Sequence, residues 1–315
     1  MRPYQSEADL IEIVDLANDC ERADQLGYWL TVDQLERSLN APEFDLKDDL
    51  RLWEDKSGQL IGYGRLGIRR MEDCVEGFIR LRVHPSVRGQ GWESKILTWA
   101  EQRLQQVQAD GQFNHSILRV GAFATQGDRI TLLQDWGFTA VRYFFEMERS
   151  LEEEIPQPQF PEGFVLRTVN SEEDGPAWVE MFNQTFIDHW NHRDLTLERY
   201  QYFTKDPDHR ADLDLIAVAA DGTFAAFCEA GIDPHNNQQN GCQEGEIHGL
   251  GTRRGFRKQG LGRAMLLAGM HRLRAAGMET AVLGVDSENP SGALKLYESV
   301  GFQKSQTSIA YAREL

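Results

Sequence analysis

The chain has 315 residues, of which 41% are hydrophobic and 26% charged, and this suits two globular domains that each bury a core. Its 50 acidic and 33 basic side chains leave a formal net charge of −17, so we expect neither nucleic acid nor a membrane surface as a partner. No apolar run approaches the length of a membrane span, and the N-terminus lacks the hydrophobic region of a signal peptide. The four scattered cysteines have no C-x-x-C spacing, which predicts free thiols and a cytoplasmic location.

Both halves of the chain follow one predicted order of elements: a helical region, a strand hairpin, a strand, a glycine-bearing loop, a helix, a strand, a short helix and a final strand. Turn signals at Asp55–Gly58 and Asp221–Gly222 mark the two hairpins. Few residues precede the first helix, so the opening strand of the first half should be short. The strand–loop–helix–strand order predicts a partly parallel sheet with helices on both faces, which is an α/β fold.

Similarity between the halves indicates a duplication. Leu81–Gly91 matches Ile247–Gly260, and Asp135–Phe138 matches Ser299–Phe302. Repeats this far apart are duplicated domains and not the units of a solenoid. A proline-rich segment between them predicts a stiff, extended linker. The predicted ranges are 1–153 for the first domain, 154–162 for the linker and 163–315 for the second domain.

The loop Arg257–Gly262 has the pattern of an anion-binding site. It follows a strand-like run, Glu246–Thr252, and opens an amphipathic helix, Leu261–Ala276. Glycines let the backbone approach phosphate oxygens, and the free N–H groups at a helix start attract an anion. The spacing R-x-x-G-x-G is neither the dinucleotide fingerprint G-x-G-x-x-G nor a P-loop.

A second motif, Asn289–Phe302, follows another apolar run at Thr280–Val285. Together, R-x-x-G-x-G and N-x-x-x-A-x-x-x-Y-x-x-x-G-F resemble the acyl-CoA-binding core of the GNAT superfamily of N-acyltransferases. The resemblance covers most of residues 163–315. It implies two GNAT-like domains, each a mixed, partly parallel sheet flanked by helices, with acetyl-CoA as the co-substrate and no metal.

The first half departs from this pattern. Glu93 stands where the second half has Gly262, and Thr125, Arg129 and Leu133 replace the motif's asparagine, alanine and tyrosine. A carboxylate at the pyrophosphate position adds bulk and repulsion, although an acidic residue in a first helical turn also suits the helix dipole without any ligand. We expect no acetyl transfer in the first domain and a mainly structural role.

The resemblance implies a coenzyme site in the second domain. Backbone groups of the strand would bind pantetheine and polarise the thioester carbonyl, and the loop cations would bind the phosphates. Asn289 has an alternative interpretation as a helix N-cap followed by Pro290. The implied coenzyme-binding residues are Leu250, Gly251, Thr252, Arg257, Lys258, Gln259, Gly260, Leu261, Gly262, Arg263 and Asn289.

Acetyl transfer to an amine needs a base for the amine proton and an acid for the leaving thiolate. Two-residue alternation predicts that Glu244, Glu246, His248 and Leu250 share one face of their strand. By resemblance, Glu246 is the base, usually through water, with Glu244 and His248 as alternatives. Tyr297 is the implied acid, although its helical stripe also fits a core aromatic. A solvent-facing carboxylate is the alternative for Glu246.

The segment Asp188–His192 contains two histidines three apart beside a carboxylate, but no third metal ligand has a defined spacing, so we predict no metal site. By resemblance, this segment covers the acceptor, and His189, Trp190, His192 and His248 would line it. The expected acceptor is a small-molecule amine. Acetylation of protein N-termini or lysines and a non-catalytic acyl-CoA-binding module are the alternatives. The oligomeric state cannot be predicted.

Overall fold

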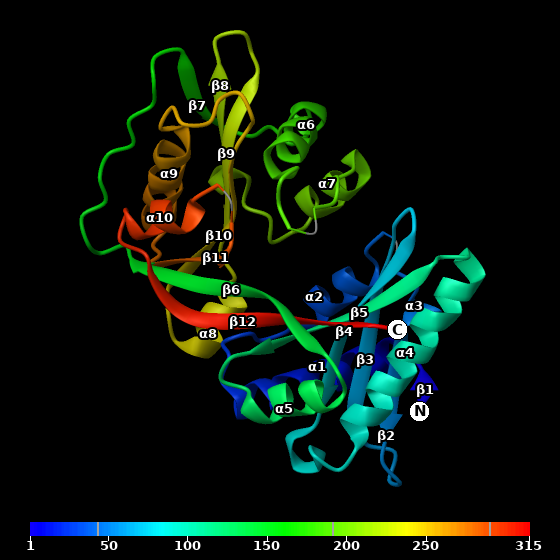
Figure 1. Cartoon of the computed structure of the whole chain (residues 1–315). Helices are drawn as coiled ribbons and strands as arrows, with labels where there is room; N and C mark the ends of the chain where they lie inside the picture. The colour runs from blue at the N-terminus through cyan, green and yellow to red at the C-terminus, as the bar shows by residue number, and fades with distance from the viewer. Residues whose placement is uncertain (43, 191, 290) are drawn as a thin grey trace. The chain divides into compact units, whose positions relative to one another are not determined.

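The computed structural model describes residues 1–42, 44–190, 192–289 and 291–315 (Figure 1). The chain forms two compact units. Unit 1 consists of Met1–Tyr143 and Ser308–Leu315, and unit 2 consists of Phe144–Thr307. Each unit holds a mixed sheet with helices, so the predicted α/β fold is confirmed.

The sheet of unit 1 has the strand order β1-β2-β3-β4-β5-β12. Strands β4 and β5 are parallel, and the other neighbours are antiparallel. The strands are β1 (Arg2–Pro3), β2 (Leu50–Glu54), β3 (Leu60–Arg70), β4 (Cys74–Val83) and β5 (His115–Phe123), and the helices are α1 (Glu7–Asp24), α2 (Val32–Leu39), α3 (Leu46–Asp49), α4 (Trp92–Gly111) and α5 (Gly127–Asp135), with a 3-10 turn at Pro85–Val87.

Unit 2 repeats this plan with the strand order β6-β11-β10-β9-β8-β7. Its parallel pair is β10 with β11. The strands are β7 (Phe164–Thr168), β8 (Asp214–Ala219), β9 (Phe224–Gly231), β10 (Glu244–Thr252) and β11 (Thr280–Asp286), and the helices are α6 (Gly175–Phe186), α7 (Leu197–Thr204), α8 (Pro234–Asn240), α9 (Leu261–Ala275) and α10 (Ala293–Glu298), with a 3-10 turn at Ala211–Leu213. The predicted hairpins and the helix after the loop are confirmed, but α8 was missed although Asp233 caps it and Pro234 opens it.

The last strand of each sequence repeat completes the sheet of the other unit. Within β6 (Thr139–Ser150), residues 144–150 pair with β11 in unit 2, and within β12 (Gln303–Glu314), residues 308–314 pair with β5 in unit 1. The compact units and the sequence repeats are therefore different sets of residues. The linker segment belongs to unit 2, where Ile155 is buried in the core.

Each sheet packs one face against a long helix. In unit 1 that face meets α4 through residues such as Leu81 and Leu104, and in unit 2 it meets α9 through residues such as Ile247 and Leu273. Helices α1 and α2 cover part of the opposite face of unit 1, and α6 and α7 cover part of the opposite face of unit 2. Apolar burial on both faces holds each sheet between its layers.

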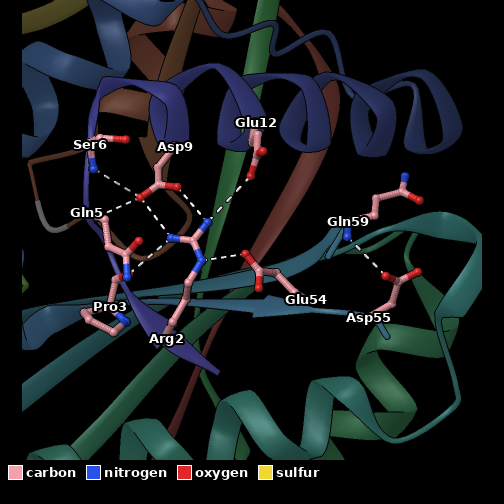
Figure 2. Close-up of polar contacts among 9 residues, drawn as sticks. All are labelled: Arg2, Pro3, Gln5, Ser6, Asp9, Glu12, Glu54, Asp55 and Gln59. Carbon is pink, nitrogen blue, oxygen red and sulfur yellow. Dashed lines mark hydrogen bonds and ion pairs between the residues drawn. The ribbon is translucent and has the colours of Figure 1, made fainter. Parts of the chain in front are cut away.

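The start of the chain is fixed by a partly buried ion-pair cluster (Figure 2). The Arg2 guanidinium donates to Asp9 at 2.7 and 2.9 Å and to Glu54 at 2.5 Å, and Asp9 also accepts from the backbone of Gln5 at 2.7 Å. These bonds hold the two-residue strand β1 and the start of α1 against β2, so the predicted short opening strand is confirmed.

Candidate active site

The parallel strands of unit 2 separate at the carboxyl end of β10. Pairing with β11 runs from Glu244, opposite Thr280, to Ile247, opposite Leu283, whereas β10 continues along β9 as far as Thr252. The backbone from Gly249 onward is therefore a sheet edge on its β11 side. An extended ligand can bond to such an edge.

The glycine loop connects this edge to α9. Gly260 has φ of 91°, and Lys258 adopts the left-handed conformation at φ 64°, which is unusual for a residue with a side chain. No side chain caps α9, and its first turn holds no acidic residue. The first-turn N–H groups therefore have the arrangement that binds an anion, with no competing carboxylate in that turn.

The Arg257 side chain braces this loop. Its Nε donates to the carbonyl of Thr252 at 3.2 Å, and its terminal nitrogens lie 2.8 Å from the carbonyl of Thr185 and 3.2 Å from the Asp188 carboxylate. Arg254 also pairs with Asp188. These contacts tie the loop to the segment after α6.

A β-bulge corrects the predicted face of β10. The register against β9 shifts between Ile247 and Gly249, so alternation is interrupted at His248. Glu246 and His248 lie on the face turned away from α9, but Leu250 packs into the α9 core. The prediction that Leu250 shares a face with Glu246 was wrong, because the extra residue flips the later positions.

Glu246 and His248 form an exposed pair. His248 Nδ1 lies 3.5 Å from the Glu246 carboxylate, and their side chains are 48% and 54% exposed. Burial lowers the pKa of His248, but the hydrogen bond to Glu246 and the charges of Glu246 and Glu229 outweigh it and raise that pKa above its ordinary value. The pair therefore offers a solvent-accessible carboxylate beside a titratable imidazole. The alternative base Glu244 lies on the same face and is half-buried, and burial raises its pKa.

Tyr297 lies in α10, 7% exposed, with its ring centroid 6.1 Å from that of Phe302. Burial raises the pKa of Tyr297 to about 12, so its hydroxyl keeps a proton at neutral pH. Tyr297 can be both a core aromatic and the proposed acid, because a buried ring can still present its hydroxyl at the end of the side chain.

The predicted acceptor and motif residues converge only in part. Asn289 Nδ2 lies 3.3 Å from His189 Nε2, so the motif asparagine and the α6–α7 segment meet. Asn289 is not the N-cap of α10, since Gly292 occupies that position, and Pro290 lies outside the described residues. The Trp190 ring lies near that of Phe144, with centroids 5.8 Å apart and ring planes tilted by 55°. His192 lies 3.0 Å from Asp194, and no group of three metal-ligating side chains occurs within the described ranges.

A buried polar cluster was missed at the sequence level. Asp214 on β8 stands directly opposite Glu229 on β9, and Tyr200 and Trp178 lie beneath them. Burial and the neighbouring Glu229 raise the pKa of Asp214 to about 8, and burial raises that of Glu229. The available signal was a carboxylate at the end of each apolar strand run, with Asp214 directly before L-I-A-V-A and Glu229 directly after F-A-A-F-C.

Unit 1 has a loop of the same geometry with different side chains around it. The backbone N–H of Gly89 donates to the Glu93 carboxylate at 3.3 Å, so the chain supplies its own anion to the loop. Arg88 donates to the Val83 carbonyl at 3.1 Å and pairs with Asp24 at 2.5 Å, as Arg257 does with Thr252 and Asp188. A cavity of about 840 Å³ lies beside this loop.

The comparisons with known proteins agree with this geometry. The family model of the acetyltransferase (GNAT) family matches residues 175–302. The mycothiol acetyltransferase of Thermobispora bispora is 30% identical over 233 residues, which cover 74% of this chain and 75% of that protein. A GCN5-related N-acetyltransferase from Sphaerobacter thermophilus superposes with a TM-score of 0.75 at 23% identity, over 99% of this chain and 94% of that one. A tandem GNAT protein from the clavulanic acid biosynthesis pathway gives 0.74 at 14% identity, over 99% and 97%.

The chain therefore belongs to the GNAT family of acetyltransferases. Within that family it is a tandem, acetyl-CoA-dependent N-acetyltransferase with the layout of the mycothiol acetyltransferases. No helix within the described residues has the length and apolarity to cross a bilayer.

Proposed function

We propose that unit 2 transfers the acetyl group of acetyl-CoA to the primary amine of a small molecule. The observation that carries this proposal is the opening between β10 and β11 beyond Ile247 and Leu283, next to the uncapped start of α9. The edge from Leu250 to Thr252 binds pantetheine, and the loop from Lys258 to Arg263 binds the phosphates. The relative from T. bispora, by its name, acetylates a small molecule, which agrees with this acceptor class.

In the proposed reaction, the amine nitrogen attacks the thioester carbonyl carbon and the carbon–sulfur bond breaks. Glu246 accepts the amine proton through water, and Tyr297 donates its proton to the leaving thiolate, so an ammonium ion and acetyl-CoA yield an amide, free CoA and one proton. Backbone N–H groups of the β10 edge stabilise the developing oxyanion. Arg257 acts through the loop that it braces. Asn289 with His189, and Trp190 with His192, form the wall of the acceptor site.

We also place the enzyme in the cytoplasm, where its four cysteines stay reduced. The test is release of the CoA thiol from acetyl-CoA by the full chain in the presence of small primary amines, with peptides carrying a free N-terminus or a lysine as a second panel. Turnover with small amines, and an acetylated product by mass, is the expected result. Turnover with peptides alone would indicate a protein acceptor in place of a small molecule. Binding of acetyl-CoA without any turnover would indicate a non-catalytic module.

A further inference from the structure

The cavity of about 840 Å³ in unit 1 is lined by the end of α1, the carboxyl end of β4, the glycine loop and the start of α5. Its volume falls within the range of pockets that bind small molecules, roughly 300–1,000 Å³. Three arginines line it from three different segments: Arg82 on β4, Arg88 in the loop and Arg129 on α5. All the lining residues belong to unit 1, so the cavity lies within one unit.

Arg129 bonds to β5 just beyond the point where β4 and β5 separate. The pairing of these strands ends at Ile79, opposite Val120. Arg129 Nε donates to the carbonyl of the next β5 residue, Gly121, at 3.0 Å. The matching opening in unit 2, between β10 and β11, is the one that we assign to pantetheine. In unit 1, a guanidinium group therefore lies at this opening.

The arginines of the cavity are side chains that unit 2 lacks. In the alignment of the two repeats, Arg129 matches Ala293. Arg82 lies six residues before the loop arginine of unit 1, and Gly251 holds that place before the loop arginine of unit 2. Two guanidinium groups of unit 1 thus replace a methyl group and a hydrogen atom of unit 2, so the unit 1 cavity is narrower and more cationic than its counterpart.

These cations outnumber the carboxylates near them. Arg88 pairs with Asp24 at 2.5 Å, and Asp24 also accepts from Gln126 at 3.4 Å. Neither Arg82 nor Arg129 forms an ion pair with any described carboxylate. Burial lowers the pKa of Arg129 to about 10, and the charges of Arg82 and Arg88 contribute in the same direction against that of Asp24. Three guanidinium groups beside one carboxylate leave two positive charges without a counter-charge.

The other acidic side chains of the lining do not neutralise these charges. Glu93 accepts from the loop backbone at Gly89, and Asp128 and Asp135 are exposed. None of these three is among the main charges that act on the pKa of Arg129. Half-buried cations without counter-charges are costly, and a bound anion removes that cost.

We propose that the unit 1 cavity binds a small organic dianion, a dicarboxylate or a phosphate monoester, through Arg82 and Arg129 beside the Arg88–Asp24 pair. A guanidinium group donates two parallel hydrogen bonds to a carboxylate or a phosphate, which makes arginine suited to either anion. A dianion matches the two uncompensated charges, whereas the pantetheine arm of a coenzyme is uncharged. The Glu93 carboxylate at the loop also repels a pyrophosphate. The cavity is thus a second ligand site, distinct in chemistry from the coenzyme site of unit 2.

The experiment is calorimetry on the full chain with acetyl-CoA at saturation, so that the anion-binding loop of unit 2 is occupied. The probes are succinate and glycerol 3-phosphate, with butanoate as a monoanion of the same chain length as succinate. We expect saturable binding of at least one dianion, about tenfold or more tighter than butanoate. The tighter dianion identifies the anionic group that the cavity prefers. No saturable binding of either dianion, or binding no tighter than that of butanoate, would overturn the inference.

Variants locate the bound dianion. Arg82→Gln and Arg129→Gln should each raise its dissociation constant by about tenfold or more, because each removes a charged hydrogen-bond donor. Arg129 also bonds to β5, whereas Arg82 has no such bond, so Arg82→Gln should fold even if Arg129→Gln does not. The control Arg70→Gln removes an exposed cation of unit 1 outside the cavity and should leave the constant unchanged. An unchanged constant in folded Arg82→Gln contradicts the assignment.

Titration of acetyl-CoA alone distinguishes the dianion from the coenzyme. We expect one acetyl-CoA per chain, and we expect Arg82→Gln to leave its affinity unchanged, because Arg82 belongs to unit 1. Two acetyl-CoA molecules per chain, with the second lost in Arg82→Gln, would assign the cavity to the coenzyme and overturn the inference. That result would leave the function proposed for unit 2 intact.

Discussion

The two units share one loop geometry but differ in the side chain that follows the loop glycine. In both, an arginine donates to a strand carbonyl and pairs with an aspartate, and a positive-φ glycine, Gly91 or Gly260, precedes the helix. In unit 1 the Glu93 carboxylate accepts from the loop backbone, whereas α9 of unit 2 has no acidic residue in its first turn. We therefore expect a single side chain, Glu93 or Gly262, to decide whether this loop binds a carboxylate of the chain itself or an external anion.

The strands beside these loops differ by one inserted residue. Added Cβ atoms at Gly77 and Gly245 would lie 2.9 Å and 2.5 Å from the equivalent leucines of α4 and α9, which aligns these two positions. Beyond them, β4 pairs with β3 without a register shift, but β10 has the bulge at His248. The inserted residue adds the imidazole of His248 beside the proposed base, Glu246. In unit 1, Phe78 occupies the position that matches Glu246.

Deleting Ser308–Leu315 should have the largest effect, a loss of stability in unit 1. The deletion removes from unit 1 the strand that pairs with β5 and buries Ile309 and Tyr311, which are 8% and 3% exposed. Losing both buried side chains costs more than about 5 kcal/mol, enough to unfold a domain of ordinary stability. Hydrogen exchange resolved by peptide should show loss of protection in β4 and β5. Retained protection there would mean that unit 1 does not need the exchanged strand.

Replacing the proposed catalytic groups tests the assignment of chemistry to unit 2. Glu246→Gln and Tyr297→Phe should each lower kcat by about 10²–10⁴-fold while acetyl-CoA affinity stays close to wild type. Steady-state kinetics and calorimetry measure the two quantities separately. Wild-type turnover in both variants would remove these roles, and loss of activity in Glu244→Gln alone would move the base by one step along β10.

Gly262→Glu copies the unit 1 residue into unit 2. A Cβ at Gly262 would lie 3.5 Å from Thr252 Oγ1 and 3.6 Å from Leu296 Cδ2, ordinary contacts, so the fold should persist. The added carboxylate would compete with the phosphates, and we expect the acetyl-CoA dissociation constant to rise by about 100-fold. Calorimetry with circular dichroism as a folding control checks this. Unchanged affinity would mean that this loop does not bind the pyrophosphate.

The carboxylate pair should make stability depend on pH. Asp214 has a folded pKa of about 8 against an ordinary value of 3.8, so its stabilising contribution is complete below pH 4 and is lost as pH rises toward 8. Asp214→Asn removes this titration, and the fall in Tm between pH 5 and pH 8 should be smaller in the variant, by the equivalent of about 2 kcal/mol. Parallel Tm curves for the two proteins would show that Asp214 titrates normally. Glu229 faces Asp214 and contributes in the same direction, so the dependence should shrink without vanishing.

Lys258→Gly should have the smallest effect on stability. Lys258 occupies the left-handed region at φ 64°, and unit 1 has Gly89 at the matching position with φ of 72°. Glycine removes a backbone cost of about 1 kcal/mol, so the variant should be at least as stable as wild type. Its acetyl-CoA affinity should fall several-fold through the lost charge, and Lys258→Ala should lose the affinity without the stability gain. A glycine variant less stable than wild type would show that the left-handed backbone at Lys258 is not strained.

The sequence by itself determined the duplication, the order of the elements apart from α8, and the loop motif. These depend on local signals, such as glycines at positive φ, turn residues and apolar periodicity, which act within a few residues of each other. The same signals distinguished the repeats, because Glu93 and Gly262 differ in charge at a position that the motif defines.

Tertiary structure alone decided three features. Strand exchange follows from which edge each terminal strand reaches, and no local pattern records the partner of a strand. The bulge at His248 changes which face Leu250 occupies, because one extra residue is compatible with the same run of residue types. Cross-strand register brings Glu148 on β6, Asp214 on β8, Glu229 on β9 and Glu246 on β10 to one face of the unit 2 sheet, although Glu148 and Glu246 are more than 90 residues apart along the chain.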